Sequence, residues 1–103
     1  MTILNLVAAA LLSAQAAVNL TWNGSLLDDS CRANNVSARC DISDDTRAFG
    51  IQTDDGKYFK FDADGNTKTR TALKTQKKSG EVKASINGLL DGETIKVASV
   101  QVH

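Results

Sequence analysis

The stretch RAFGIQTDDGKYFKF, which spans residues 47–61, decides the fold. Apolar and polar side chains alternate in both halves, so that Phe49 shares a face with Ile51, and Phe59 shares a face with Phe61. The Asp-Asp-Gly tripeptide between the halves supplies a glycine, which accepts the positive φ of a tight turn. The stretch therefore predicts a β-hairpin, with strands over residues 47–53 and 57–61.

A second hairpin is predicted towards the C-terminus. Apolar residues alternate with polar ones on both sides of the turn-forming pair Asp91-Gly92: Val82, Ala84, Ile86, Ile95 and Val97. Val100 and Val102 then occupy the opposite parity. This change of parity predicts a β-bulge near Ala98-Ser99.

The first strand is predicted before both hairpins, from Val18 to Leu27. Its start alternates strictly, because Asn19 and Thr21 separate the apolar residues Val18, Leu20 and Trp22. The pair Asn23-Gly24 predicts a bulge or bend within this strand.

Residues 67–78, between the two hairpins, are predicted to form a helix. Asn66 can cap its first turn, Gly80 lies just past its end, and lysines near that end suit the helix dipole. Three strands, a helix and two further strands follow the order of a mainly β, five-stranded OB-like barrel with one short helix. An SH3-like barrel or a small sandwich would not need this helix.

Residues 28–46 contain little to bury beyond Val36 and Ile42, which predicts a long loop. The chain has two cysteines, Cys31 and Cys40, and both lie within this loop. We expect them to form a disulfide, because two thiols this close in an exported chain more often pair than act as nucleophile or ligand. Closing a loop of about ten residues is worth about 2.5–3 kcal/mol in the chain-entropy model.

The beginning of the chain is an uncharged apolar run over residues 3–12 that ends in Ser13-Ala14-Gln15-Ala16. This pattern is typical of a secretory signal peptide, and it is shorter than the roughly 18 apolar residues of a membrane span. We therefore expect residues 1–16 to be a signal peptide and residues 17–103 to be one domain, periplasmic or secreted, with no membrane span. A buried N-terminal helix is the alternative.

The assembled sequence resembles a family of uncharacterised exported bacterial proteins with an OB-like β-barrel. The resemblance covers nearly all of the expected domain, through the matching pieces Trp22-Asn23-Gly24-Ser25-Leu26, Asp29, Cys31, Cys40, Thr46-Arg47-Ala48-Phe49, Asp55-Gly56-Lys57, Phe61-Asp62, Gly65-Asn66 and Ile86-Asn87-Gly88-Leu89-Leu90-Asp91-Gly92-Glu93-Thr94-Ile95-Lys96-Val97. Relatives often carry a longer insertion between the cysteines. The resemblance implies the fold and the compartment, and it supplies no catalytic or binding residues.

Two groups of carboxylates raise the question of a cation. Asp62 and Asp64 precede Gly65-Asn66, but the glycine is misplaced for an EF-hand, and a turn that caps a helix explains the run better. A second acidic group gathers on the loop, where it can hold a cation loosely, meet a basic partner or simply remain solvated: Asp28, Asp29, Asp41, Asp44 and Asp45.

Basic residues crowd the predicted helix and the segment after it: Lys68, Arg70, Lys74, Lys77, Lys78 and Lys83. Such a patch can attract phosphate backbones or other anions, although a solvated helix face explains it more simply. OB folds bind nucleic acid through several stacking aromatics, and Tyr58 is the only aromatic expected to face outward here. We therefore do not expect nucleic acid as the partner.

Catalysis finds little support in the sequence. The only histidine is the terminal His103, which no flanking segment can orient as a general base, and neither G-x-S-x-G nor H-E-x-x-H occurs. We expect no enzyme, no metal and no other cofactor.

The leading hypothesis is an exported, non-enzymatic OB-like module that binds a small ligand or an envelope protein. OB barrels present ligands on the face of strands two and three and on the loop that joins strands one and two. The candidate residues on that face are Arg47, Gln52, Tyr58 and Lys60, next to the Cys31–Cys40 loop. The alternative is a structural or stress-protective envelope protein without a ligand site, and in either case we expect a monomer.

Overall fold

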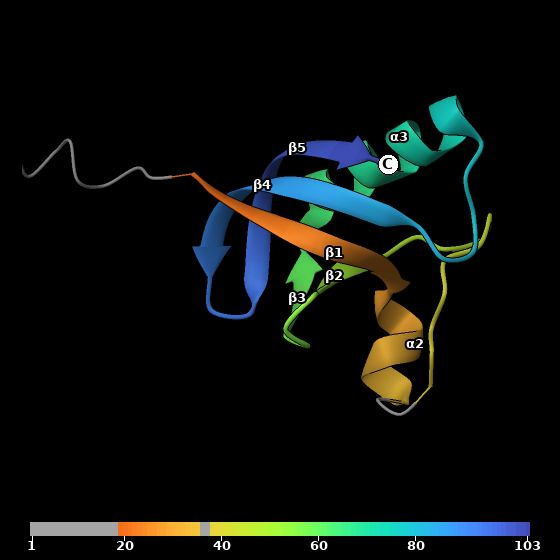
Figure 1. The fold of residues 1–103 in the computed structure, drawn as a ribbon, viewed down its shortest axis with the longest axis horizontal. Coiled ribbons are helices and arrows are strands. Elements are labelled where there is room, and N and C mark those ends of the chain that lie inside the picture. Colours follow the sequence, from red (N-terminus) through yellow and green to blue (C-terminus); the bar gives the residue numbers. More distant parts are fainter. Residues whose placement is uncertain (1–18, 36–37) are drawn as a thin grey trace, which may run out of the picture.

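The structure is a computed structural model that describes residues 19–35 and 38–103. The described part contains five strands and two helices (Figure 1): β1 Leu20–Asp28, α2 Asp29–Asn34, β2 Phe49–Thr53, β3 Tyr58–Phe61, α3 Ala63–Gln76, β4 Lys83–Asp91 and β5 Thr94–Val102. The predicted signal peptide, residues 1–16, lies outside the described residues.

The strands close into a barrel in the order β1-β2-β3-β5-β4, with β4 pairing back onto β1. All neighbours are antiparallel except β3 and β5, which pair in parallel through Lys60 with Thr94 and Phe61 with Ile95. This order, with a helix between β3 and β4, confirms the predicted OB-like barrel. Because α3 is helical, the SH3-like and sandwich alternatives lose their support.

Both predicted hairpins are confirmed. Gly56 and Gly92 occupy their turns with φ of 88° and 63°, a region that glycine enters without a steric penalty. The predicted bulge is also confirmed, because Asn87 pairs with Ser99 whereas Gly88 pairs with Val97, which leaves Ala98 as the extra residue of β5.

Of the bulge or bend predicted at Asn23-Gly24, the bulge is wrong, because β1 pairs with β4 without interruption from Leu20 to Ser25. Gly24 is instead a point of close backbone approach between β1 and β2. A Cβ at Gly24 would lie 2.0 Å from the carbonyl oxygen of Gln52. The start of β1 is also less buried than its alternation suggests, since the side chain of Leu20 is 47% exposed.

The core lies inside the barrel, where residues of alternating parity from all five strands meet α3. Its most buried large side chains are Phe49, Leu26, Ile51, Ile86, Ile95 and Thr69. At the edge of this core, Trp22 packs against Phe59 with ring centroids 6.0 Å apart.

The predicted helix is confirmed, but its ends differ from the prediction. Asp62 caps α3, since its Oδ1 accepts hydrogen bonds from the amides of Gly65, at 2.9 Å, and Val97, at 3.1 Å. Asn66 lies inside the helix, where its Oδ1 accepts from the Phe49 amide. The helix ends at Gln76, and Lys77 follows it in the left-handed conformation with φ of 54°.

The buried face of α3 is made by Gly65, Thr69 and Leu73, which lie four residues apart. A Cβ at Gly65 would lie 2.5 Å from a methyl carbon of Val97, so the helix approaches β5 closely. The Thr69 hydroxyl donates to the Gly65 carbonyl and is thereby satisfied within the core. An apolar stripe does not mark this face, because two of its three buried residues are not hydrophobic.

The prediction of an unstructured loop over residues 28–46 is wrong in its first part, because α2 begins directly after β1. The Asp28 carboxylate caps α2 by accepting from the Cys31 amide. Since β1 and β3 are each antiparallel to β2, they run in the same direction, and the helices that follow them begin at the same end of the barrel (Figure 1). The segment of residues 38–48 lies at this end, where it is joined to α2 by the disulfide and lies next to α3.

Candidate functional site

The structure places three of the four predicted binding residues on the outer face of β2 and β3. Gln52 is the register partner of Tyr58, and Lys60 is the partner of Gly50, while the alternate residues of these strands point into the barrel. Arg47 lies in the segment before β2 and is exposed. Lys60 is also exposed, whereas Gln52 and Tyr58 are half-buried.

Tyr58 is not an open aromatic surface, because it makes the contact between the sheet and α2. Its hydroxyl donates to Oδ1 of Asp29 at 2.6 Å, and the Arg32 guanidinium lies 5.0 Å from the ring centroid. Burial raises the pKa of Tyr58, and the hydrogen bond and negative charge of Asp29 raise it further. The hydroxyl therefore stays protonated and holds α2 against the barrel.

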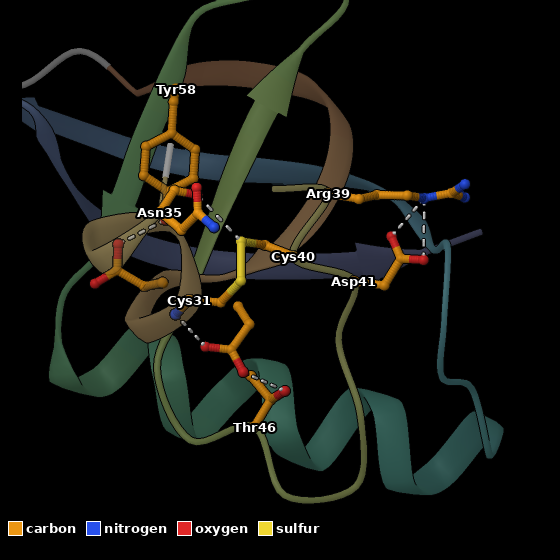
Figure 2. The surroundings of a disulfide bond; sticks show 9 residues. Cys31, Asn35, Arg39, Cys40, Asp41, Thr46 and Tyr58 are labelled. Atoms are coloured by element: carbon orange, nitrogen blue, oxygen red, sulfur yellow. Dashed lines mark hydrogen bonds and ion pairs between the residues drawn. A yellow bond between two sulfur atoms is a disulfide. The ribbon is translucent and has the colours of Figure 1, made fainter. Parts of the chain in front are cut away.

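The predicted disulfide between Cys31 and Cys40 is confirmed, and it joins α2 to the segment that follows (Figure 2). Asp28 reinforces this junction, because its amide donates to the Cys40 carbonyl and its Oδ2 accepts from the Thr46 hydroxyl. Asp29 adds a further link through its amide, which donates to the Ala48 carbonyl. The disulfide is thus one member of a connected set of bonds.

Three of the five carboxylates of the acidic loop group already have partners within the protein. Asp28 caps α2, Asp29 accepts from Tyr58, and Asp41 pairs with Arg39. Asp44 and Asp45 remain exposed. Within the described ranges, no three acidic, histidine or cysteine side chains gather as a metal site would require.

A shallow hollow of about 360 Å³ lies between the outer face of β1–β2 and the disulfide-linked segment, and we refer to it as the disulfide hollow. Its lining is polar and charged, with Leu27 and Ala38 as the exceptions: Ser25, Leu27, Arg32, Ala38, Arg39, Asp41, Gln52 and Glu81. Two arginines face two carboxylates there. Arg39 bonds both carboxylates, Asp41 at 3.1 Å and also Glu81, so these charges are compensated inside the protein.

A larger pocket of about 500 Å³ lies between the C-terminal half of α3 and residues 43–46, and we refer to it as the cationic pocket. It contains four basic side chains, Arg70, Lys74, Lys77 and Lys78. The remaining lining consists of hydroxyl side chains, one carboxylate and two apolar floor residues: Ser43, Thr46, Ser79, Asp44, Phe49 and Leu73.

Two backbone features hold the walls of the cationic pocket together. Ile42 forms a β-bridge with Gly80, whose amide donates to the Ile42 carbonyl at 3.0 Å. The following turn closes on itself, because the Ser43 amide donates to the Thr46 hydroxyl and the Thr46 amide donates to the Ser43 carbonyl. These bonds place a hydroxyl-bearing turn opposite the end of α3.

The basic side chains of the cationic pocket form no ion pairs with the other described residues. In the part of the chain that the structure describes, no ion pair involves Arg70, Lys74, Lys77 or Lys78. The Lys78 ammonium donates to the main-chain oxygen of His103, the last residue of the sequence, at 2.8 Å, so this ammonium already has a partner within the protein. Against the single carboxylate of Asp44, four positive charges leave a net charge of +3 in the pocket.

His103 is held by two contacts, neither of which makes it a general base. Its amide donates to the Lys83 carbonyl, and its Nε2 lies 2.8 Å from the hydroxyl oxygen of Ser85. The Ser85 hydroxyl donates its only proton to Oδ1 of Asn23 at 2.5 Å, so the imidazole acts as a donor to Ser85. This arrangement does not activate the serine as a nucleophile.

The sequence misses the hydroxyl side of the cationic pocket. Ser43, Thr46 and Ser79 carry no motif, and they approach α3 only because a bridge joins residues far apart in the chain. The basic residues are identified by the sequence, but Lys68 and Lys83 of that predicted patch do not line the pocket.

Comparisons with protein-family models, with curated proteins and with solved structures each found no significant match. Among residues 19–35 and 38–103, no helix has the length and apolar character of a membrane span.

Proposed function

We propose that this chain is an exported, non-enzymatic binding module of OB-like fold that takes a small anionic ligand in the cationic pocket. The observation that carries the proposal is the group of four basic side chains, with one carboxylate among them and no ion pair to any described residue, around a pocket of about 500 Å³. Pockets of this volume commonly hold small molecules. Uncompensated charges that line one favour a ligand of opposite sign.

The proposal of export draws support from two observations. The apolar run followed by Ala14-Gln15-Ala16 matches a cleaved secretory signal, and Cys31 and Cys40 are paired, as is usual in oxidising compartments. The resemblance to exported bacterial proteins points in the same direction and stays a prediction.

The outer face of β2 and β3 is the weaker of the two candidate sites. The Tyr58 hydroxyl and ring already contact Asp29 and Arg32 of α2, and Arg47 lies outside the strands. Gln52 and Lys60 alone offer little to a ligand. That face stays a prediction as a binding surface for a small molecule or an envelope protein.

A structural or stress-protective role is the second candidate, and the bonds around the disulfide favour it. Hydrogen bonds and the disulfide fix α2 to the rest of the protein through five residues: Asp28, Asp29, Cys31, Cys40 and Tyr58. A protein whose main role is structural needs such stabilising bonds. In that case the lysines of the cationic pocket would only solubilise the surface.

Amide chemical-shift mapping of the purified oxidised protein, expressed from the full chain, separates the two candidates. Sodium phosphate, pyrophosphate, citrate and octanoate are added at constant ionic strength, which holds the screening of exposed charges fixed. We expect shifts to concentrate at residues 43–46 and 70–79. Shifts confined to Gln52 and Lys60 would support the sheet face instead, and uniformly weak shifts would support the structural role.

Two matched variants complete this experiment. Lys74→Gln removes one charge from the pocket, and Lys68→Gln removes one from the same helix outside it. Glutamine has a helix propensity similar to that of lysine, so neither change disturbs α3. Equal binding by the two variants would contradict the proposed site.

A further inference from the structure

We infer that the ligand of the cationic pocket is a compact molecule with two or more closely spaced oxyanion groups, such as adjacent phosphoryl groups or a polycarboxylate. This inference rests on the proposed anion site and narrows the chemistry of its ligand. It follows from the number of charges, their spacing, the hydroxyl groups opposite them and the nature of the pocket floor.

The number of charges favours more than one anionic group. Arg70, Lys74, Lys77 and Lys78 contribute four positive charges, and Asp44 compensates one of them. A single carboxylate would leave a net charge of +2 in the complex, and a single sulfate would leave a net charge of +1. A ligand with two or three negative charges matches the pocket more closely.

The spacing of the basic residues favours a compact ligand. Arg70 and Lys74 lie one helical turn apart, which corresponds to about 6 Å along the axis of α3. Lys77 and Lys78 follow the helix directly. Flexible side chains at this spacing can contact neighbouring groups of one small molecule at the same time.

The opposite wall supplies hydroxyl groups that can donate to oxyanions. The Ser43 hydroxyl oxygen accepts from the Asp45 amide, which leaves its own proton for a ligand. Ser79 is exposed at the other edge of the pocket. The Thr46 hydroxyl is already committed, because it donates to Asp28.

The floor argues against two other classes of anion. Phe49 is 1% exposed and Leu73 is 7% exposed, so these two floor side chains offer little surface to the acyl chain of an amphiphile. Phe49 is also the only aromatic residue of the lining, and its burial removes it as a stacking platform for a nucleobase. Fatty acids and nucleic acids therefore fit the pocket less well than small polyanions.

Isothermal titration of the purified oxidised full chain with four probes tests the inference: pyrophosphate, citrate, orthophosphate and octyl phosphate. At 150 mM salt we expect pyrophosphate or citrate to bind about tenfold more tightly than orthophosphate, because a second charge-assisted hydrogen-bonding group engages. Tighter binding of pyrophosphate than of citrate would indicate a phosphorylated ligand, and tighter binding of citrate would indicate a polycarboxylate. A short oligothymidylate serves as the nucleic-acid probe.

The variants make the result specific to the pocket. Lys74→Gln and Lys77→Gln should each weaken pyrophosphate binding about five- to tenfold, and the control Lys68→Gln less than about twofold. Equal affinity for orthophosphate and pyrophosphate, or tighter binding of octyl phosphate or oligothymidylate, would overturn the inference and leave an anion site in place. No binding by any probe, or equal effects of Lys74→Gln and Lys68→Gln, would overturn the proposed function as well.

Discussion

The disulfide hollow and the cationic pocket lie on the same protein but use their charges in opposite ways. In the disulfide hollow, Arg39 bonds Asp41 and Glu81, so the protein supplies its own counter-ions. In the cationic pocket, Arg70 and Lys74 have no ion pair among the described residues. Charge density alone therefore does not identify a binding site. Charges that are paired within the protein contribute to its architecture, and only unpaired charges are available to a ligand.

The largest effect should come from removing the covalent link beside the disulfide hollow. Changing both cysteines, Cys31→Ser with Cys40→Ser, is expected to lower the free energy of unfolding by about 2–3 kcal/mol, because the unfolded chain regains the entropy of an open loop. Urea denaturation of the variant and of the oxidised parent measures this difference.

The same variant also tests whether the two regions are independent. Pyrophosphate binding should remain where the variant is folded, because neither cysteine lines the cationic pocket. A loss of pyrophosphate binding by a variant that keeps a native circular dichroism spectrum would show that the disulfide also shapes the cationic pocket.

The next largest effect on stability should come from the hydrogen bond between Tyr58 and Asp29, which holds α2 against the barrel. Tyr58→Phe keeps the ring but removes the hydroxyl that donates to Asp29, and we expect a loss of about 1 kcal/mol in the free energy of unfolding at pH 7. Thermal and urea unfolding give the value. An unchanged stability would mean that the Asp29 carboxylate finds an equivalent partner in water.

The contribution of the Tyr58 hydroxyl should depend on pH in the alkaline range. Burial and Asp29 raise the pKa of Tyr58 above its unfolded value of about 10, so the unfolded state loses this proton first. The stabilisation is fully present below pH 10 and is lost as the pH rises towards the folded-state pKa. The difference in stability between the parent and Tyr58→Phe should therefore shrink above pH 10, and a constant difference would contradict the raised pKa.

A smaller effect is expected where the cationic pocket carries its one carboxylate. Asp44→Asn should strengthen pyrophosphate binding about two- to fivefold, which corresponds to the interaction energy of exposed charges. Asp45→Asn is the matched control, because Asp45 is exposed but does not line the pocket. Titration calorimetry compares the two variants, and weaker binding by Asp44→Asn would place the anion elsewhere.

The smallest effect should come from the ion pairs of the disulfide hollow. The Arg39 side chain is 68% exposed, so Arg39→Gln is expected to leave the free energy of unfolding close to that of the parent. Urea denaturation at low and high salt checks this value. A much larger loss would show that ion pairing, rather than the disulfide and Tyr58, holds this region.

The barrel is predictable from the sequence where a local pattern coincides with the final contacts. The glycine turns and the alternation around them define both hairpins, and the change of parity before Val100 locates the bulge at Ala98. The N-terminal end of α3 is not predictable in this way. Asp62 and Asn66 are both able to cap, and distant amides decide between them, since Val97 donates to Asp62 and Phe49 donates to Asn66.

The candidate site is less predictable for a related reason. The six residues of α2 bury no side chain, so no periodic pattern predicts this helix. The sequence therefore also does not show that Tyr58 contacts α2 through Asp29 and is not open to a ligand. The cationic residues are visible in the sequence, but the bridge between Ile42 and Gly80 that completes their pocket depends on the folded chain. Local patterns therefore indicate the scaffold, and long-range contacts determine the site.

Lys77 combines a left-handed backbone conformation with a side chain that lines the cationic pocket. Glycine adopts this conformation more easily than any other residue, so Lys77→Gly would relax the end of α3. The same exchange would remove one of the four positive charges that line the cationic pocket. A substitution that favours thermal stability would therefore weaken the binding of the proposed anion, so Lys77 is a position where stability and the proposed recognition would conflict.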